Sequence, residues 1–262
     1  MNHLLDSIID ICHMVGVFQL KNLRSVSADA ITDKGLNQLV SFVDVESEKM
    51  LVAKLAELRP DAGFITEENT APAARENQTV WIIDPLDGTT NYLHGLQIFS
   101  ISVALMEHGQ LAAGVVYIPA LGETFCAAKG CGAFLNNKPI KVSKTKNLSE
   151  SLIATGFPYH EFQQTEAYLR LLGELMRGTH GLRRMGSAAI DLAYTACGRF
   201  DGFYETGLSA WDVAAGALIV QEAGGMVTDF KKTDQYIFGK QIVAGNPSIM
   251  EALQEATQKY LG

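Results

Sequence analysis

The sequence predicts a mixed α/β fold, and three observations support this prediction. The first 20 residues carry apolar side chains at helical spacing, which indicates an amphipathic helix. Short apolar runs separated by turn residues follow between residues 99 and 135, a pattern typical of an antiparallel meander. Residues 213–220 are apolar on every face of a helix and end at Gly224-Gly225, so a buried helix is expected there.

The composition is that of an ordinary globular protein. Of 262 residues, 47% are hydrophobic and 19% are charged, enough to bury a large core. A polar and basic stretch, Lys141 to Ser149, separates a half at about 1–145 from a half at about 146–262, and we expect these halves to form one domain, 1–262.

The first 80 residues are expected to contain two helices followed by one short strand. The N-terminal helix has Leu4, Leu5, Ile8, Ile9, Cys12 and Val15 on one face. After an irregular stretch around Ser27 to Gly35, a second helix begins near Asp44 and ends before Pro60. A short strand, Gly63 to Thr66, leads into Glu67-Glu68, and Ala71 to Gln78 forms a loose surface connection.

The most informative stretch is Trp81 to Tyr92. An apolar run, Val80 to Ile83, predicts a buried strand that ends in two carboxylates, Asp84 and Asp87. Pro85 and Gly88 make the following loop stiff. Carboxylates this close repel each other unless a cation lies between them, although Asp and Gly also suit an ordinary turn.

The meander comprises Phe99–Leu105, Leu111–Ile118, Glu123–Ala127 and Ala133–Leu135, with Gly130 to Gly132 as a hairpin turn. A helix over Glu161 to Arg177 follows, and Ser187 caps another that ends at Gly198. The remaining elements are strands at Phe200–Tyr204, Met226–Phe230 and Gln241–Ala244, and a final helix from Pro247. Glu205 closes the first of these strands.

The net charge of −8 disfavours nucleic acid as a partner. Small anions stay possible, because a bound metal reverses the local charge. Met1 to Leu20 lacks the basic start of a secretory signal, and no run approaches the roughly 18 apolar residues of a membrane helix. We therefore expect a cytoplasmic protein without membrane contact, whose cysteines, Cys12, Cys126, Cys131 and Cys197, are buried free thiols.

Acidic residues at the ends of the expected helices and strands indicate which kind of reaction the protein could catalyse. Glu67, Asp84, Asp87 and Asp212 could hold two or three Mg²⁺ ions, and the sequence offers no convincing nucleophile, so hydrolysis of a phosphoester by metal-activated water is expected. Each acid also has a structural interpretation: Asp44 and Asp212 as helix caps, and Glu67 as part of a solvated loop.

Two families have similar motifs. Asp-x-Asp-Gly-Thr resembles the haloacid-dehalogenase phosphatases, but the second residue between Asp84 and Asp87 argues against that mechanism. Trp81 to Tyr92 is similar to the first signature of the inositol monophosphatase family, in the fructose-1,6-bisphosphatase/inositol phosphatase superfamily. Trp211 to Gly216 with Glu222 to Gly225 resembles its second signature, and the likeness covers nearly the whole chain.

This resemblance implies an α/β (α+β) fold, a layered αβαβα sandwich of the sugar-phosphatase type with mixed and antiparallel sheets. It also implies a homodimer, dependence on Mg²⁺ and inhibition by Li⁺. By position in the family's motifs, this resemblance implies that the metal ligands are Glu67, Asp84, Asp87, Asp212 and the carbonyl of Leu86. It implies that Thr89 and Glu67 orient the attacking water, and that Asp44 supports Thr89. The implied substrate-binding residues are Asp87, Gly88, Thr89, Ala188, Glu205 and Asp212.

The chain departs from the family pattern at Thr66, Gln38 and Ser41, which affects the surroundings of Asp44 and the loop near Lys34. We expect a small phosphorylated alcohol as substrate, most simply an inositol monophosphate, because a polyol can donate hydrogen bonds to Glu205. The alternatives are histidinol phosphate, fructose bisphosphate, NADP or 3′-phosphoadenosine phosphates, or a non-catalytic regulator that binds metal or phosphate.

Overall fold

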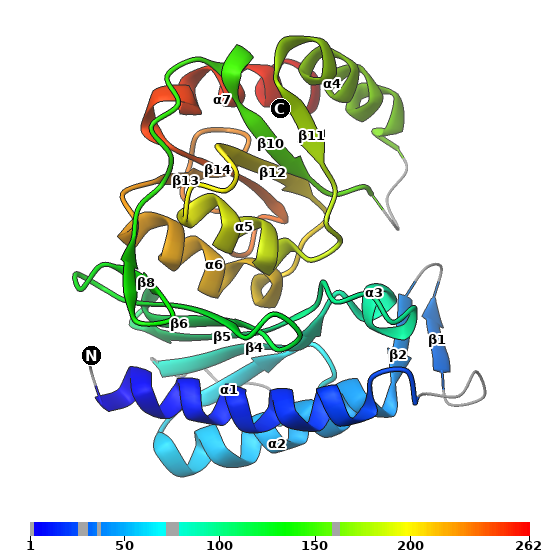
Figure 1. Cartoon of the computed structure of the whole chain (residues 1–262), viewed down its shortest axis with the longest axis vertical. Coiled ribbons are helices and arrows are strands. Elements are labelled where there is room, and N and C mark those ends of the chain that lie inside the picture. The colour runs from blue at the N-terminus through cyan, green and yellow to red at the C-terminus, as the bar shows by residue number, and fades with distance from the viewer. Residues whose placement is uncertain (1–2, 26–30, 36–37, 72–78, 159–162) are drawn as a thin grey trace.

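The computed structural model describes residues 3–25, 31–35, 38–71, 79–158 and 163–262, with side chains from residue 40 onward in the segment that starts at 38. Within these ranges the chain forms five layers, helices alternating with sheets (Figure 1). The predicted αβαβα sandwich with mixed sheets is confirmed.

The larger sheet has seven strands in the order β3-β4-β5-β6-β7-β8-β9. Only β3 and β4 pair in parallel, and the others form the predicted antiparallel meander. The strands are β3 (Gly63–Thr66), β4 (Thr79–Asp87), β5 (Ser100–Glu107), β6 (Gln110–Ile118), β7 (Glu123–Ala128), β8 (Ala133–Leu135) and β9 (Lys138–Ile140).

The smaller sheet has five strands in the order β11-β10-β12-β14-β13, with β10 parallel to both of its neighbours and β14 antiparallel to both of its own. Its strands are β10 (Leu152–Thr155), β11 (Gly181–Arg183), β12 (Gly202–Thr206), β13 (Met226–Thr228) and β14 (Gln241–Gly245). A separate hairpin joins β1 (Ile31–Gly35) to β2 (Gln38–Ser41), and a 3₁₀ turn spans Leu148–Glu150.

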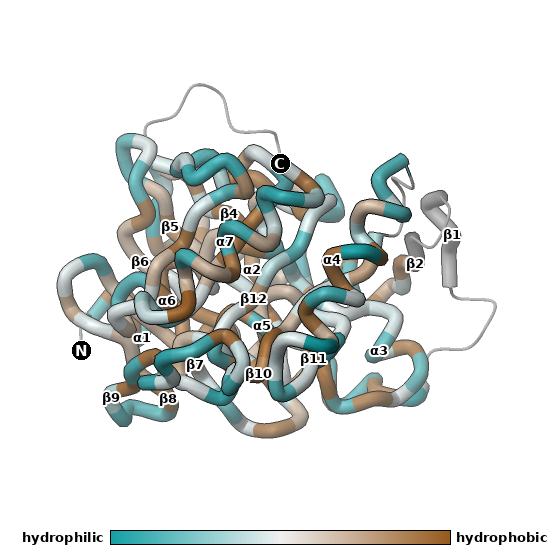
Figure 2. The backbone as a smooth tube through the Cα atoms, turned by 90° about the horizontal axis from the view of Figure 1, so that it is seen from above, coloured by the Kyte–Doolittle hydropathy of each residue, from teal (hydrophilic) through white to brown (hydrophobic). Residues whose placement is uncertain are grey.

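Helices cover the outer faces of both sheets and fill the space between them (Figure 1). The outer pairs are α1 (His3–Asn22) with α2 (Phe42–Leu58), and α4 (Thr165–Gly178) with α7 (Pro247–Leu261). The middle layer consists of α5 (Ala188–Ala196) and α6 (Ala210–Glu222), and α3 (Thr89–Leu93) is a short turn after β4. Figure 2 shows α4 alternating between hydrophilic and hydrophobic colour, as expected of a helix that buries Tyr168, Leu171 and Leu175.

Strand β4 is buried on both faces. Trp81 and Ile83 pack against α1 and α2, while Val80 and Ile82 join the core that includes α5 and α6, as the two-residue period of a strand requires. The core cluster that contains Val80 and Ile82 includes residues from both sheets and from the middle helices. Residues before 145 and after 146 therefore share one hydrophobic interior.

The middle layer is packed closely through two glycines. A Cβ atom on Gly114 of β6 would lie 3.0 Å from the carbonyl oxygen of Ala215, and one on Gly216 of α6 would lie 2.6 Å from the Cβ of Leu192 in α5. These close approaches pack α6 tightly against the main chain of β6 and the side chain of Leu192 in α5.

Several predicted boundaries were wrong. Residues 31–35 form β1 instead of an irregular stretch. They are a strand because they pair with β2, and their sequence has no apolar pattern that would have indicated it. Helix α2 starts at Phe42 and is capped by Ser41, so Asp44 is its third residue and not its cap. Strand β4 continues through Asp84 to Asp87, and Glu205 lies inside β12, paired with Ile242. Helix α4 starts at Thr165, four residues after the predicted start, and residues 159–162 lie outside the described ranges.

The side chains of Lys34 and Gln38 and most of the connection at 71–78 also lie outside the described residues. Cys12 and Cys126 are buried as predicted, but Cys131 is exposed in the hairpin turn and Cys197 is half-buried; all four are free thiols. In the described part of the chain, α1 alone is long and apolar enough to cross a membrane, and Leu5, Ile8, Cys12 and Val15 on it are buried in the protein core.

Candidate active site

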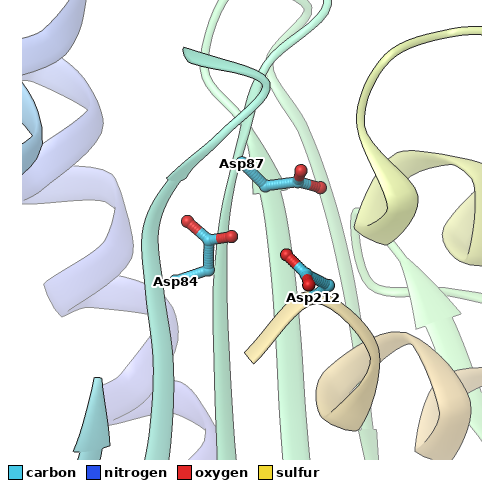
Figure 3. A group of neighbouring side chains, drawn as sticks. All are labelled: Asp84, Asp87 and Asp212. Carbon is cyan, nitrogen blue, oxygen red and sulfur yellow. The ribbon is translucent and has the colours of Figure 1, made fainter. Parts of the chain in front are cut away.

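A cavity of about 880 Å³ is lined by residues from β4, α5, β12 and α6. At this cavity Asp84, Asp87 and Asp212 each place a carboxylate oxygen within 4.8 Å of the others. Figure 3 shows the first two extending from β4 and the third from the start of α6, with all three carboxyl groups directed into one space. Acids from two distant parts of the sequence are thus brought together.

A bulge in β4 aims its two aspartates. Asp84 pairs with Ser102 and Asp87 with Ser100, so β4 has one more residue than β5 across this interval. The extra residue lets both side chains reach the cavity side of the strand. The main-chain N–H of Leu86 donates to Asp84 at 2.9 Å, and the Pro85 carbonyl accepts from Gln19 on α1 at 2.7 Å.

The carboxyl group of Asp87 is held by the N-terminus of α5. Its Oδ2 accepts hydrogen bonds from the Ser187 hydroxyl at 2.6 Å and from the main-chain N–H of Ala189 at 2.8 Å. Burial raises the pKa of Asp87 to about 6, although these hydrogen bonds favour the charged form. Ser187 thus caps α5, as predicted, and also orients a site carboxylate.

Asp212 lies in the first turn of α6 and accepts a 2.6 Å hydrogen bond from the main-chain N–H of Ser209. The predicted capping role is therefore real, and it coexists with a place in the acidic cluster. Burial and the nearby Asp87 raise the pKa of Asp212 to about 8.

Glu67 lies beside this cluster of three aspartates because β3 and β4 are adjacent and parallel, with Thr66 opposite Ile83. Burial, followed by the charges of Asp212 and Glu68, raises the pKa of Glu67 to about 8. Glu67 lines the cavity instead of lying in a solvated loop. The pKa of Asp84 is raised well above its ordinary value, first by burial and then by Glu67.

Glu48 of α2 fixes the turn after Glu67. This carboxylate is fully buried and accepts from the main-chain N–H of Glu68 at 2.7 Å, and from the main-chain N–H and hydroxyl of Thr70 at 2.8 Å each. Both of its oxygens are used, so the chain that leaves Glu67 is tied to a rigid helix.

Thr89 lies between Asp44 and the main chain of β4. Its hydroxyl is 2.8 Å from Oδ1 of Asp44 and 3.1 Å from the carbonyl oxygen of Leu86. Asp44 is buried, and its Oδ2 accepts from both the main-chain N–H and the hydroxyl of Ser41. Burial raises the pKa of Asp44 above its ordinary value. Ser41 therefore supports Asp44 directly, although it departs from the family pattern.

Ala188 and Glu205 also line the cavity. Burial raises the pKa of Glu205 to about 8, while the nearby Arg184 acts in the opposite direction. A Cβ atom on Gly156 would fall 1.7 Å from Oε1 of Glu205, so only glycine leaves room for this carboxyl group. Gly88 adopts a φ of 94°, and a side chain there would crowd the carbonyl oxygens of Ile98 and Gly186.

The acids fit a hard divalent cation. Glu67, Asp84, Asp87 and Asp212 offer only oxygen donors, and burial together with neighbouring acids raises the pKa values of Glu67, Asp84 and Asp212. A divalent cation stabilises deprotonated carboxylates that otherwise repel one another.

Comparison with known proteins identifies the group to which this arrangement belongs. The model of the inositol monophosphatase family matches residues 14–261. The chain belongs to the inositol monophosphatase family. It is accordingly a phosphatase, a phosphoric monoester hydrolase.

Relatives cover almost the full length. An inositol-1-monophosphatase of Mesorhizobium japonicum is 42% identical over 249 residues, which is 92% of this chain and 94% of the relative. Nus factor SuhB of Escherichia coli is 38% identical over 253 residues, 97% and 95% of the two chains. The crystal structure of extragenic suppressor protein suhB from Bartonella henselae has a TM-score of 0.92 at 38% identity, over 98% of this chain and 99% of that one.

Several residues at the inositol monophosphatase site were not predicted from the sequence: Gln19, Glu48, Gly156, Arg184 and Asp191. For two of them a signal existed. Gln19 follows Leu5, Ile8, Cys12 and Val15 on the buried face of α1, and Glu48 precedes Leu51 and Leu55 on that of α2. A polar residue on an apolar helix face needs a buried partner.

Proposed function

We propose that this protein is a Mg²⁺-dependent phosphomonoesterase that hydrolyses a small phosphorylated alcohol, inositol monophosphate in particular. One observation carries the proposal: Asp84, Asp87 and Asp212 converge within 4.8 Å at a cavity large enough for a sugar-sized phosphate ester. The family supplies the reaction class.

We assign the metal ligands to Glu67, Asp84, Asp87, Asp212 and the carbonyl of Leu86. When bound, two to three Mg²⁺ ions would lower the pKa of a water molecule, hold phosphate oxygens and stabilise the leaving alkoxide. Asp87 is oriented for this role by the start of α5, because its Oδ2 accepts from Ser187 and Ala189.

The water that attacks phosphorus would be oriented by Thr89 and Glu67. Because the Thr89 hydroxyl has one hydrogen and its shorter contact is to Asp44, its lone pairs are left to accept a hydrogen bond from water. Asp44 is therefore a positioning residue, itself held by Ser41. Gly88 and Thr89 lie on the cavity wall and would donate their main-chain N–H groups to the phosphate.

Glu205 and Ala188 would contact the alcohol part of the substrate. A buried carboxyl group that faces a cavity favours an alcohol rich in hydroxyls. Histidinol phosphate, fructose bisphosphate, NADP and 3′-phosphoadenosine phosphates are the competing substrates. From the family we further propose a cytoplasmic homodimer that Li⁺ inhibits and that binds neither nucleic acid nor membrane.

A non-catalytic regulator is the second candidate, because the relative from Escherichia coli is named Nus factor SuhB. Phosphate release from a panel of phosphorylated alcohols, with Mg²⁺ and with EDTA, separates the candidates. We expect Mg²⁺-dependent release with the highest kcat/KM for inositol monophosphate. Absence of release from every ester would refute the enzymatic proposal.

Asp212→Asn tests the assigned cluster. Asparagine retains an oxygen that can cap α6 but has no negative charge for the cation, so this folded variant should lose nearly all turnover. Exposed Asp234→Asn is the matched control and should remain fully active.

A further inference from the structure

Asp191 is a buried carboxyl group at the cavity that the proposed mechanism does not use. It lies near the start of α5, its side chain is 1% exposed, and it lines the cavity. Its Oδ1 has no hydrogen-bond partner within the described ranges of the chain. Leaving a buried acceptor unpaired destabilises a protein, so each such group needs an explanation.

The main chain of Asp191 is fully engaged, which fixes the position of the side chain. Its N–H donates to the carbonyl of Ser187 at 3.0 Å, and its carbonyl accepts from the Thr195 hydroxyl at 2.8 Å. The same turn of α5 donates through Ser187 and Ala189 to Asp87. Asp191 is thus held on a rigid helix that also orients a site carboxylate.

The charges around Asp191 place it near Glu205, the residue proposed to contact the alcohol part of the substrate. The carboxyl group of Glu205 is the charge that acts on it most strongly, followed by Asp87 and by Arg184. Arg184 acts in the same way on Glu205 and Asp87, so one guanidinium lies near three carboxyl groups. All of these residues line the cavity.

We propose that Asp191 is a specificity-determining residue that hydrogen-bonds a substrate hydroxyl, next to the hydroxyl contacted by Glu205, and so selects phosphate esters of polyols. The proposal rests on the proposed function and goes beyond the family's assigned residues. Neighbouring hydroxyls of a polyol can serve both carboxyl groups together. An ester without hydroxyls leaves the Asp191 acceptor unpaired.

The chemistry makes this selection strong. A site that contains buried polar groups discriminates against analogues that cannot pair with them, because those groups then remain desolvated and unbonded. An ordered water molecule could also satisfy Asp191, but it would do so equally for every substrate. The two explanations therefore differ in how the effect of a substitution depends on the substrate.

The test compares myo-inositol 1-phosphate with p-nitrophenyl phosphate, which has no alcohol hydroxyl. Asp191→Leu should lower kcat/KM for the inositol ester by about ten- to a hundredfold, mainly through KM, and change that for the aryl ester less than twofold. Asp191→Asn keeps an acceptor oxygen and should lose less activity. It also keeps the test decisive if the leucine variant fails to fold.

Thr195→Val is the matched control on the same helix, since among the described residues its hydroxyl bonds only the carbonyl of Asp191. It should affect both substrates equally and slightly. Equal losses for the two esters in the Asp191 variants, or no loss for either, would overturn the proposal. If the wild-type enzyme hydrolyses p-nitrophenyl phosphate but no polyol ester, the proposed substrate is wrong, and the role of Asp191 is overturned with it. If the wild-type enzyme hydrolyses the polyol ester but the Asp191 variants do not distinguish the two esters, only the role of Asp191 is overturned.

Discussion

Glu48 accepts three hydrogen bonds through its two carboxylate oxygens from the turn that follows Glu67. An amide at this position would direct two N–H donors toward one another. We predict that Glu48→Gln lets Glu67 move away from Asp84, lowering kcat about tenfold or more and raising the Mg²⁺ concentration at half-maximal activity.

Glu46→Gln is the control, because Glu46 is exposed on the same helix and pairs only with Lys49 among the described residues. Steady-state kinetics over a Mg²⁺ titration measures both variants. Unchanged Mg²⁺ dependence in Glu48→Gln would show that the turn does not position Glu67.

Gly156 provides the space that the carboxyl group of Glu205 occupies. In Gly156→Ala the new methyl group would overlap Oε1 of Glu205, so the carboxyl group must move. We predict a rise in KM for the polyol ester of tenfold or more, with little change for p-nitrophenyl phosphate. Gly178→Ala, at a helix end where a Cβ meets nothing within 4 Å, should leave both values unchanged.

Gln19 links α1 to the end of β4 through the Pro85 carbonyl, and the Tyr92 hydroxyl donates to the carbonyl of Gln19. Gln19→Leu conserves the approximate volume and leaves the Pro85 oxygen unpaired. We expect a loss of about 1–3 kcal/mol in the free energy of unfolding, measured in urea. A Gln19→Leu variant as stable as wild type would mean that water replaces the amide group of Gln19. Gln110→Leu is the control, because Gln110 is exposed on the surface.

The pH dependence of stability should reverse when metal is added. The pKa values of Glu67 and Asp212 are raised to about 8 in the fold, whereas in the unfolded chain they are about 4. Between these values the folded state binds more protons, so the free energy of unfolding of the metal-free protein should fall as pH rises from about 4 to about 8.

Mg²⁺ binds the deprotonated acids, so its stabilisation should grow across the same interval. Thermal unfolding at pH 5, 6.5 and 8, with EDTA or with Mg²⁺, gives the measurement. Glu205 shares the raised pKa, so it contributes to the fall but not to its reversal. Metal-free protein that becomes more stable toward pH 8 would contradict this prediction.

The local pattern of apolar residues predicted those helices and strands whose side chains are buried at a regular spacing or on every face. The apolar face of α1, the run in β4 and the all-apolar α6 were found because each buries a regular set of side chains. The acids of the two signatures were also identified in advance, and three of them meet in space.

Features that depend on pairing partners could not be predicted in this way. The bulge that carries β4 through Asp84 and Asp87 depends on the register with β5, and the boundaries of β1 depend on β2. Glu48, Gly156 and Asp191 owe their roles to residues that are distant in the sequence: Glu68 for Glu48, and Glu205 for Gly156 and Asp191. A single sequence does not encode those neighbours in any local period.

The close approach of α6 to Gly114 and Leu192 has a consequence for genetics. Asp212 is carried by a helix that cannot shift to absorb an added methyl group, so Gly114→Ala or Gly216→Ala would push the acid itself out of alignment. Loss-of-function alleles should therefore accumulate at these two interior glycines as well as at the carboxylates, and an enzyme inactivated there would retain all of its acidic side chains.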